Sequence, residues 1–385
     1  MRRALLLSWC VAALPVAASA QSSQFGVRGV GLPARGLSTR ATATGGGFGI
    51  FDAESSVNPA ALSSVSALTA TFTALQEFRS TTHAAGSGNV RETRFPQLAV
   101  SGPIKGLPLV LSASFSTYSN RDYSVAGVDT LLLRGVRVGV ADTLVSRGGL
   151  SNIRIGAAYR TGAAGSIGIG VHIISGSDRA EARRTFSDTL YLPVRDRTEL
   201  SSTAVGFSVG TVQQLSPALS VAAVVRTDGP LRIYRDSTRV GRLDLPWTFG
   251  GGVHFRASPR LDLATQATYR TWTSANADLA GTASLPASNT VELSLGGEYL
   301  TDPRRPGRRP LRFGVRYGTL AFPLTAGARP HELGVAVGTG IRFARQRDGL
   351  DHAGLDLTLE HVSRSDGTGR SERAWLLSFG VTLRP

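Results

Sequence analysis

The chain is nearly without cysteine, methionine and lysine, and it has no long hydrophobic run after its first twenty residues. Its single cysteine, Cys10, lies in the leader described below, so the mature chain holds no disulfide, and a small disulfide-stapled fold is excluded. Lys105 is the only lysine among 42 basic residues. Beyond the leader, no window approaches the ~18 apolar residues that a membrane-spanning helix needs.

The leader has the pattern of a secretory signal. Two arginines follow Met1, then comes an apolar run from Ala4 to Ala17, then the small residues Ala18-Ser19-Ala20. A charged start, a short apolar core and a small-x-small end predict a signal peptide over residues 1–20, cleaved before Gln21. The sequence therefore predicts an exported bacterial protein.

The composition is low in charge, and its charge is strongly basic. Hydrophobic residues make up 42% of the chain and charged residues 18%, and the formal net charge falls from +15 to +13 when Arg2 and Arg3 leave with the leader. Two interpretations of the preference for arginine are open: base-composition bias, and pairing of guanidinium groups with the phosphates of an outer-leaflet glycolipid. An exported chain without a basic, aromatic-interleaved cluster is not expected to bind nucleic acid.

From about Ser66 onward, apolar and polar residues alternate with a period of two. One face of each segment is apolar, and the other carries polar residues, glycines or single charges, which is the pattern of a half-buried strand. A clear example is the stretch 291–296, in which Val, Leu and Leu alternate with Glu, Ser and Gly. The same pattern recurs at 68–74, 261–270, 311–318, 333–343, 355–360 and 375–384.

Two features favour a membrane barrel over a soluble sandwich. The polar face is rich in glycine and in charges of both signs, which suits a crowded, wet lumen. The apolar face often ends in an aromatic residue, which suits an interfacial girdle. The sequence predicts an all-β fold, a transmembrane antiparallel β-barrel of about fourteen strands over residues 66–385. The girdle residues are Tyr159, Phe255, Tyr269, Tyr299 and Phe343.

Connections of two kinds alternate along this region. We expect the short ones, and both chain termini, on the periplasmic side, and the long polar ones outside the cell. The short links fall at 103–108, 161–165, 215–218 and 257–260, and two longer links, 301–310 and 344–353, fit the same phase. The long loops fall at 83–91, 126–149, 176–200, 227–242, 273–288, 322–330 and 364–373, some of them partly strand.

The stretch 45–62, GGGFGIFDAESSVNPAAL, differs from everything after it. Asn58 is a good helix N-cap, and Pro59 suits the first helical position, so we expect one short helix that ends by Ser66. One interpretation places residues 21–65 inside the barrel as a plug, or hatch. The alternative is an ordinary N-terminal arm with one capped turn.

This stretch resembles the FadL-like family of outer-membrane long-chain fatty acid and hydrocarbon transporters. The resemblance rests on a glycine-rich start, an aromatic and an acid (Phe51 and Asp52), and then Asn-Pro-Ala and a leucine before the first strand. The chain departs from the family pattern in having Ala61 after Asn-Pro-Ala. It also ends in Leu-Arg-Pro, whereas many barrels end in an aromatic residue that the barrel insertion machinery recognises.

The resemblance implies a fourteen-stranded barrel with an N-terminal hatch, a porin-like channel for passive, hatch-gated uptake of hydrophobic small molecules. It implies ligand or hatch contacts for Phe48 and Phe51, and anchoring of the hatch helix by Asn58, Pro59 and Ala60. The expected partners are outer-membrane lipid and lipopolysaccharide, the hydrophobic ligand, and the barrel insertion machinery. The alternatives are a non-transporting scaffold or shuttle barrel of a protein secretion system, and a general porin.

The titratable residues show no pattern of an active site. The six histidines have no metal-binding spacing, and no Ser–His or Asp–His set is evident, so we expect no enzyme, cofactor, metal or catalytic residue. Inward charges are expected either to pair across strands and hold the plug, or to leave one arginine for a ligand carboxylate. The principal lumen charges are Arg270, Glu292, Arg312, Arg316, Arg342 and Glu360.

Overall fold

The computed structural model describes residues 23–83, 86–162, 164–280, 285–302, 308–345 and 351–384. The expected signal peptide and its cleavage site before Gln21 lie outside the described residues.

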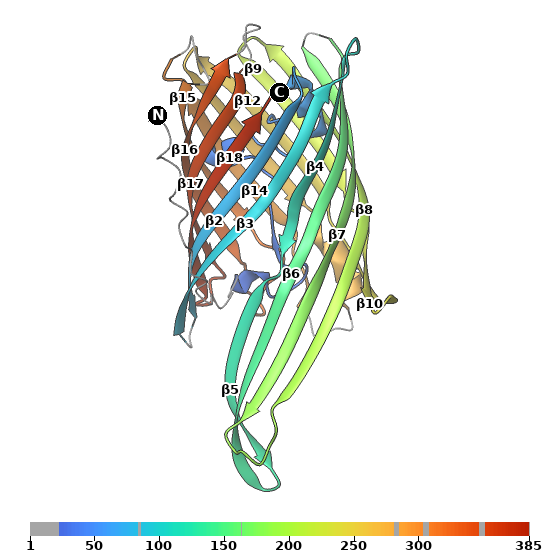
Figure 1. The fold of residues 1–385 in the computed structure, drawn as a ribbon, viewed down its shortest axis with the longest axis vertical. Helices are drawn as coiled ribbons and strands as arrows, with labels where there is room; N and C mark the ends of the chain where they lie inside the picture. Colours follow the sequence, from blue (N-terminus) through green and yellow to red (C-terminus); the bar gives the residue numbers. More distant parts are fainter. Residues whose placement is uncertain are drawn as a thin grey trace, which may run out of the picture.

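A single closed sheet forms the wall of the molecule (Figure 1). Each wall strand pairs antiparallel with the next, and β18 pairs with β2 to close the ring. The predicted fold class and strand count are confirmed: in the described residues the wall has fourteen strands. They are β2 (Thr69–His83), β3 (Gly86–Pro103), β4 (Leu109–Asn120), β6 (Val136–Arg160), β7 (Gly165–Phe186), β8 (Val194–Ser216), β9 (Leu219–Thr227), β12 (Trp247–Ser258), β13 (Leu261–Arg270), β14 (Thr290–Tyr299), β15 (Arg308–Thr319), β16 (His331–Arg345), β17 (Asp351–Ser365) and β18 (Ser371–Leu383).

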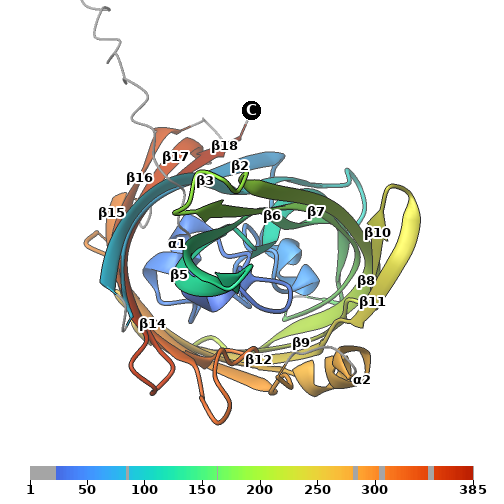
Figure 2. The same ribbon diagram turned by 90° about the horizontal axis from the view of Figure 1, so that it is seen from below.

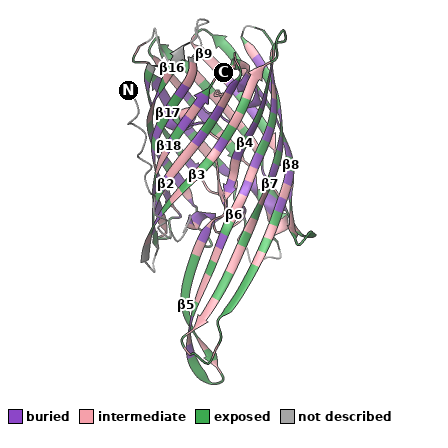
Figure 3. Cartoon of the chain, viewed as in Figure 1, coloured by how far each residue is buried: buried purple, intermediate pink, exposed green. Residues whose placement is uncertain are grey.

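The two faces of the wall have the polarity that the alternation predicts. On β14, Leu293 and Leu295 are 53% and 55% exposed on the outside, whereas Ser294 between them is 3% exposed. The same outward exposure of apolar side chains continues around the ring, and burial alternates along each strand (Figure 3). Of the described helices, none is long and apolar enough to cross a membrane. A closed barrel with an apolar outer band is a transmembrane β-barrel.

The barrel has a short-turn end and a long-loop end, and several predicted long loops are in fact strand. Segments of β6, β7 and β8 extend well past the rest of the wall at the long-loop end, and β5 (Tyr123–Leu133) pairs along β6 there (Figure 1). We call this four-stranded extension, residues 123–149 and 176–202, the projection. Elsewhere the long connections hold the hairpin β10 (Pro230–Arg235) and β11 (Thr238–Asp244), and the short helices η3 (Trp272–Ala275) and α2 (Asn276–Leu279).

The N-terminal segment lies inside the ring (Figure 2). We call its described part, residues 23–65, the plug. It contains η1 (Gln24–Gly26), β1 (Leu32–Pro33), α1 (Thr39–Ala43) and η2 (Pro59–Ser64). It begins beside Glu372, near the long-loop end of β18, and ends at the short-turn end, where it enters β2. The expectation that both termini lie at the short-turn end is therefore wrong for the first described residues, although it holds for the last described residues.

Candidate functional site

Glycines on the inner wall allow the plug backbone to approach closely. A Cβ on Gly168 would lie 2.3 Å from the Ala60 nitrogen, one on Gly296 would lie 2.1 Å from the Thr44 oxygen, and one on Gly314 would lie 2.1 Å from the Thr44 carbonyl carbon. Real Cβ atoms do not approach other atoms so closely. The many inward glycines of the sequence thus mark, at these positions, the surface against which the plug packs.

Asn58 anchors the second half of the plug. Its side-chain oxygen accepts a hydrogen bond from the Ala60 nitrogen at 3.0 Å and caps η2, and Pro59 occupies the first turn, as predicted. Its amide nitrogen donates to the Ile50 and Thr211 carbonyls at 3.1 and 3.3 Å. The fully buried Asn58 side chain therefore caps the N-terminus of η2, links two parts of the plug and joins the plug to β8.

Ion pairs hold the other side of the plug to β14–β17. Arg40 of α1 donates to Glu298 at 3.0 Å, and the same carboxylate accepts from Arg312 at 2.6 Å. Arg312 also bonds Asp356 at 2.6 Å, and Arg342 reaches Asp356 at 2.9 Å. Buried charges are stable only when they are paired and hydrogen-bonded. The chain of alternating charges satisfies each carboxylate with two guanidinium groups.

A second network binds the first part of the plug. Arg35 donates to Glu360 at 2.9 Å, and Glu360 also accepts from Arg316 at 2.9 Å. Arg316 then pairs with Glu332, which pairs with Arg364. Two of the predicted lumen charges, Arg316 and Glu360, thus come together with a plug residue, which supports the pairing interpretation for them.

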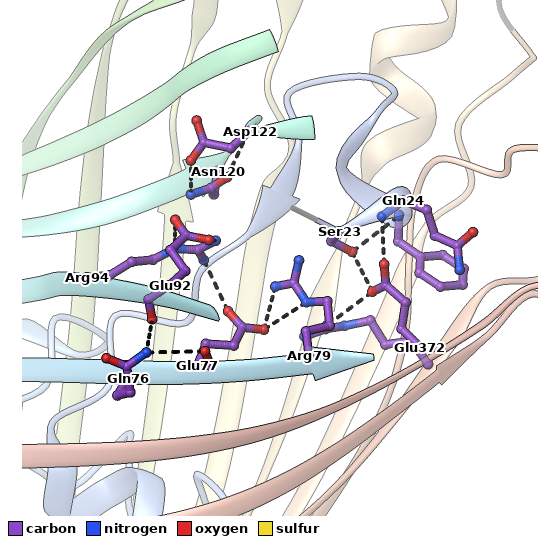
Figure 4. Close-up of polar contacts among 12 residues, drawn as sticks. Ser23, Gln24, Gln76, Glu77, Arg79, Glu92, Arg94, Asn120, Asp122 and Glu372 are labelled. Carbon is purple, nitrogen blue, oxygen red and sulfur yellow. Dashed lines mark hydrogen bonds and ion pairs between the residues drawn. The ribbon is translucent and has the colours of Figure 1, made fainter. Parts of the chain in front are cut away.

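The first described residues of the plug bind the same wall (Figure 4). The Glu372 carboxylate accepts from the Ser23 hydroxyl at 2.7 Å and from the Gln24 backbone nitrogen at 2.6 Å. Nearby on the wall, Glu77 accepts from Arg79 and lies 3.6 Å from Arg94. The sequence analysis missed Glu372 because it lies in a stretch expected to be loop. The one available indication is its spacing: in a strand, a residue three positions before the outward Trp375 lies on the opposite, inner face.

Two cavities lie on the long-loop side of the plug and share its stretch Pro33–Leu37 as a partition. One, of about 90 Å³, is lined by Val57, Val224 and Trp272 together with Arg226 and Arg270. The other, of about 140 Å³, lies between the partition, β2–β4 and β15–β18. A single segment of the plug therefore separates two pockets, and its displacement would join them.

Arginines near the first cavity have unused hydrogen-bonding capacity. Arg270 forms no hydrogen bond or ion pair with the described residues, and it lines this cavity. Arg226 pairs with Asp228 at 2.6 Å, but its Nη2 is buried without a partner in the described part of the chain. Arg154, 2% exposed on the neighbouring inner wall, leaves two nitrogens similarly unpaired. An anion placed here would meet unsatisfied donors.

The third large space is a vestibule of about 420 Å³ at the short-turn side of the plug. Phe48 and Phe51 line it, with ring centroids 5.4 and 5.8 Å from that of His254. The two phenylalanines thus face the vestibule rather than the cavities on the long-loop side. Arg342 and Arg312 belong to the paired network, whereas Glu292 lines a small cavity of about 30 Å³ beside Arg270.

The wall is interrupted beside the second cavity. The ladder between β3 and β4 ends at the pair Gln97 and Ser116, while β3 continues along β2 alone. Beyond this point, the β4 residues Ser119 and Asn120 pair instead with Pro33 and Leu32 of the plug strand β1. The plug strand β1 therefore pairs with the edge of β4 that is no longer paired with β3. We call this place the β3–β4 seam.

Two of the histidines, His172 and His254, are hydrogen-bonded to neighbouring wall side chains. His172 is fully buried between Asn152 at 3.1 Å and Ser208 at 2.8 Å, and His254 lies 3.3 Å from Asp262. Within the residues that the structure describes, no group of three or more His, Cys, Asp or Glu side chains could hold a metal ion.

Solved structures with the same fold are transport channels of the FadL type. A FadL homologue of Pseudomonas aeruginosa matches with TM-score 0.64 and 14% identity, over 92% of this chain and 99% of that one. The Pseudomonas putida toluene transporter TodX matches with TM-score 0.59 and 12% identity over 91% and 99%, and the Ralstonia pickettii toluene transporter TbuX with 0.58 and 13% over 91% and 98%. The predicted resemblance is thus confirmed for the fold.

Sequence comparison gives a different family name. A search of curated protein sequences finds no match. The sequence model of the BamG family matches residues 1–239, which is more than half of the chain. The chain therefore belongs to the BamG family and has the FadL-type barrel fold.

Proposed function

We propose that the protein is a bacterial outer-membrane channel for the uptake of hydrophobic small molecules by passive diffusion, and that the plug is its hatch. The apolar outer band requires a lipid environment. The fold is that of solved structures described as hydrocarbon channels and toluene transporters. The long-loop end faces the outside, where it receives the ligand, and the vestibule at the short-turn end opens toward the periplasm.

The ligand is an amphipathic carboxylate of the fatty acid class. The cavity between the plug and β9–β13 combines apolar lining residues with Arg270, which has no partner in the described chain. This unpaired guanidinium beside Val224 and Trp272 is the observation that carries the proposal. A carboxylate bound bidentately to it would satisfy the arginine, while the apolar tail packs on the lining side chains.

The partition Pro33–Leu37 is the moving part of the hatch. It separates the two cavities, and it is held by two pairs of strand contacts to β4 and by the ion pair of Arg35 with Glu360. Its displacement would join both cavities and uncover the β3–β4 seam, where the wall strands are not paired to each other. The joined space would then accept a chain longer than either cavity holds.

A disulfide across β1 and β4 tests the hatch. Leu32 and Asn120 are direct partners in the ladder, and such Cα atoms lie ~4.5–5.5 Å apart, within disulfide range. The mature chain has no other cysteine to interfere. In the variant Leu32→Cys/Asn120→Cys we expect fatty acid uptake into liposomes or cells to fall when the disulfide forms and to recover on reduction.

The control is Ser365→Cys/Ser371→Cys, a facing pair that closes the β17–β18 hairpin; the plug residue Gln24 bonds only the backbone carbonyl of Ser371, which the substitution leaves in place. Oxidation of this pair should leave uptake unchanged. Unaltered uptake through the oxidised Leu32/Asn120 variant would refute a moving hatch. Equal growth on fatty acid of a strain with and without the protein would refute uptake itself and favour a scaffold barrel.

A further inference from the structure

The outer face of the projection continues the lipid-facing face of the barrel. Along β6, β7 and β8, residues that face each other form rows across the three strands. The last apolar row is Ile153, Ile173 and Val205, all at least 41% exposed. The next two rows outward contain only small or hydroxyl residues. They are Ser151, Ser175 and Thr203, and then Gly149, Ser177 and Ser201.

Charged rows come next on the same face. Arg147, Arg179 and Glu199 form the first, and Thr143, Arg183 and Arg195 form the third. The row between them holds Val145, Glu181 and Arg197. The three rows together contain five arginines and two glutamates, a net charge of +3.

Two arginine pairs in these rows are directly opposed. Arg147 faces Arg179, and Arg183 faces Arg195, and like charges in this position destabilise a sheet. The two glutamates relieve only part of the repulsion: Glu199 bonds Arg179 at 2.9 Å, and Glu181 bonds both Arg195 and Arg197. Arg147 and Arg183 form no ion pair with the described residues. The face therefore has a surplus of positive charge that a bound anion would neutralise.

The position of the face indicates the source of that anion. Arg179 lies six residues beyond Ile173, which is about 20 Å along a strand and, for a strand tilted by ~40°, about 15 Å along the membrane normal. The order of the rows, apolar, then hydroxyl, then arginine, matches the order acyl chain, sugar and phosphate of a glycolipid. The rows are continuous with the lipid-facing wall, so a neighbouring lipid reaches them without leaving the membrane.

We propose that this arginine face binds the phosphate groups of lipopolysaccharide standing beside the barrel in the outer leaflet. The guanidinium groups of Arg147 and Arg183 would contact phosphates bidentately, and the serines nearer the membrane would bond the sugar hydroxyls. The proposal does not depend on transport, because none of these residues lines the lumen. It gives the projection a role in fixing the barrel within the glycolipid layer.

Binding of purified lipopolysaccharide to the full chain in detergent tests this assignment. The probe is lipopolysaccharide with its phosphates, compared with the same glycolipid after chemical removal of the phosphates. The variant Arg147→Gln/Arg183→Gln removes two charges that have no ion pair to lose. We expect its affinity for the phosphorylated probe to fall by about tenfold or more, with a weaker dependence on salt.

The matched control is Arg235→Gln/Arg239→Gln on the β10–β11 hairpin, which changes the total charge equally at another exposed site. It should bind as the parent chain does, and heat-modifiable mobility on gels should show that both variants fold. Equal loss in the control, or equal binding of the dephosphorylated glycolipid, would overturn the proposal. Full competition by inorganic phosphate at low concentration would reassign the face to free phosphate and overturn it as well.

Discussion

At the scale of single residues, Arg270 bears most directly on the choice of ligand. The guanidinium forms no hydrogen bond or ion pair with the described residues, so the variant Arg270→Gln breaks no such bond, and we expect little change in stability. Its loss should weaken fatty acid binding about tenfold to a hundredfold, the effect of a charge-assisted hydrogen bond. Binding of an uncharged hydrocarbon should not change, and both affinities can be measured by calorimetry on the detergent-solubilised chain.

The variant Arg270→Lys is the control for this prediction, because it keeps the charge but loses the bidentate geometry, and it should bind with intermediate affinity. A parallel loss for the uncharged hydrocarbon would mean that Arg270 shapes the pocket rather than reads a carboxylate.

We expect docking of the plug in the barrel to depend on pH through Glu54. It lies in the plug and in no wall strand, and burial raises the pKa of its carboxyl to about 7, with a further contribution from the Asp52 carboxylate. Arg342 and Arg40 oppose this rise, and Asp356 adds to it. Because the pKa of Glu54 is higher when the plug is docked, docking is coupled to the uptake of a proton. The contribution of Glu54 to the stability of the docked plug is therefore complete below pH ~4.5 and is lost as the pH rises through about 7.

We therefore expect channel openings in planar bilayers to become more frequent between pH 5 and pH 8. The variant Glu54→Gln keeps the shape of the side chain without a titratable group, and its opening frequency should vary less over this range. A variant with an unchanged pH profile would assign the dependence to another group.

At the scale of elements, the fit between plug and wall depends on glycine. A Cβ on Gly314 would meet the Thr44 carbonyl carbon at 2.1 Å, which is backbone and cannot rotate away. We expect Gly314→Ala to displace α1 and to destabilise the docked plug by about 1–3 kcal/mol, the usual effect of overpacking. Faster proteolysis of the plug with an intact barrel would show this.

Gly251 provides the matched control, because a Cβ there meets no atom within 4 Å. Gly251→Ala should leave the plug as resistant to protease as in the parent chain. Equal sensitivity of both variants would indicate a general effect of losing a strand glycine.

Much of this architecture could be predicted because each wall strand has one face in lipid and one in the lumen. That asymmetry produces an alternation of apolar and polar residues at stretches such as 291–296. The helix N-cap at Asn58 could also be predicted, because it depends only on neighbouring residues. Over the projection the sequence predicts long loops that are only partly strand, because both of its faces lie beyond the apolar outer band, so polar residues occupy both and the period of two is weak. Ion-pair partners such as Arg35 and Glu360, 325 residues apart, depend on strand register, which composition does not encode.

At the scale of the whole molecule, the plug is held unevenly. Charged networks tie it to β14–β18, whereas on β7 and β8 the hydrogen bonds come from uncharged groups: the Asn58 amide donates to the Thr211 carbonyl, and the Ser166 hydroxyl donates to the Ala60 carbonyl. The first plug residues also bond Glu372. Motion of the partition should therefore break the pair of Arg35 with Glu360 while the helix at Asn58 stays docked.

The variant Arg35→Gln tests this order of events. Glu360 keeps its bond to Arg316, so the wall network survives, and only the link to the partition is lost. Because the Glu360 carboxylate is nearly inaccessible to solvent, removal of one of its partners should strongly destabilise the docked partition. We expect more frequent and longer openings in planar bilayers, and faster fatty acid uptake.

The control variant is Arg94→Gln. Arg94 lines the same cavity as Arg35, but it pairs with wall residues rather than with the plug. This variant lowers the lumen charge equally but leaves the partition anchored, so its conductance should stay near that of the parent chain. If both variants open alike, the lumen charge itself governs conductance and the partition is not the gate. If only Arg35→Gln opens, the ion pair to Glu360 is the latch that a ligand must release, and an arriving carboxylate can do so by competing with Glu360 for the same guanidinium.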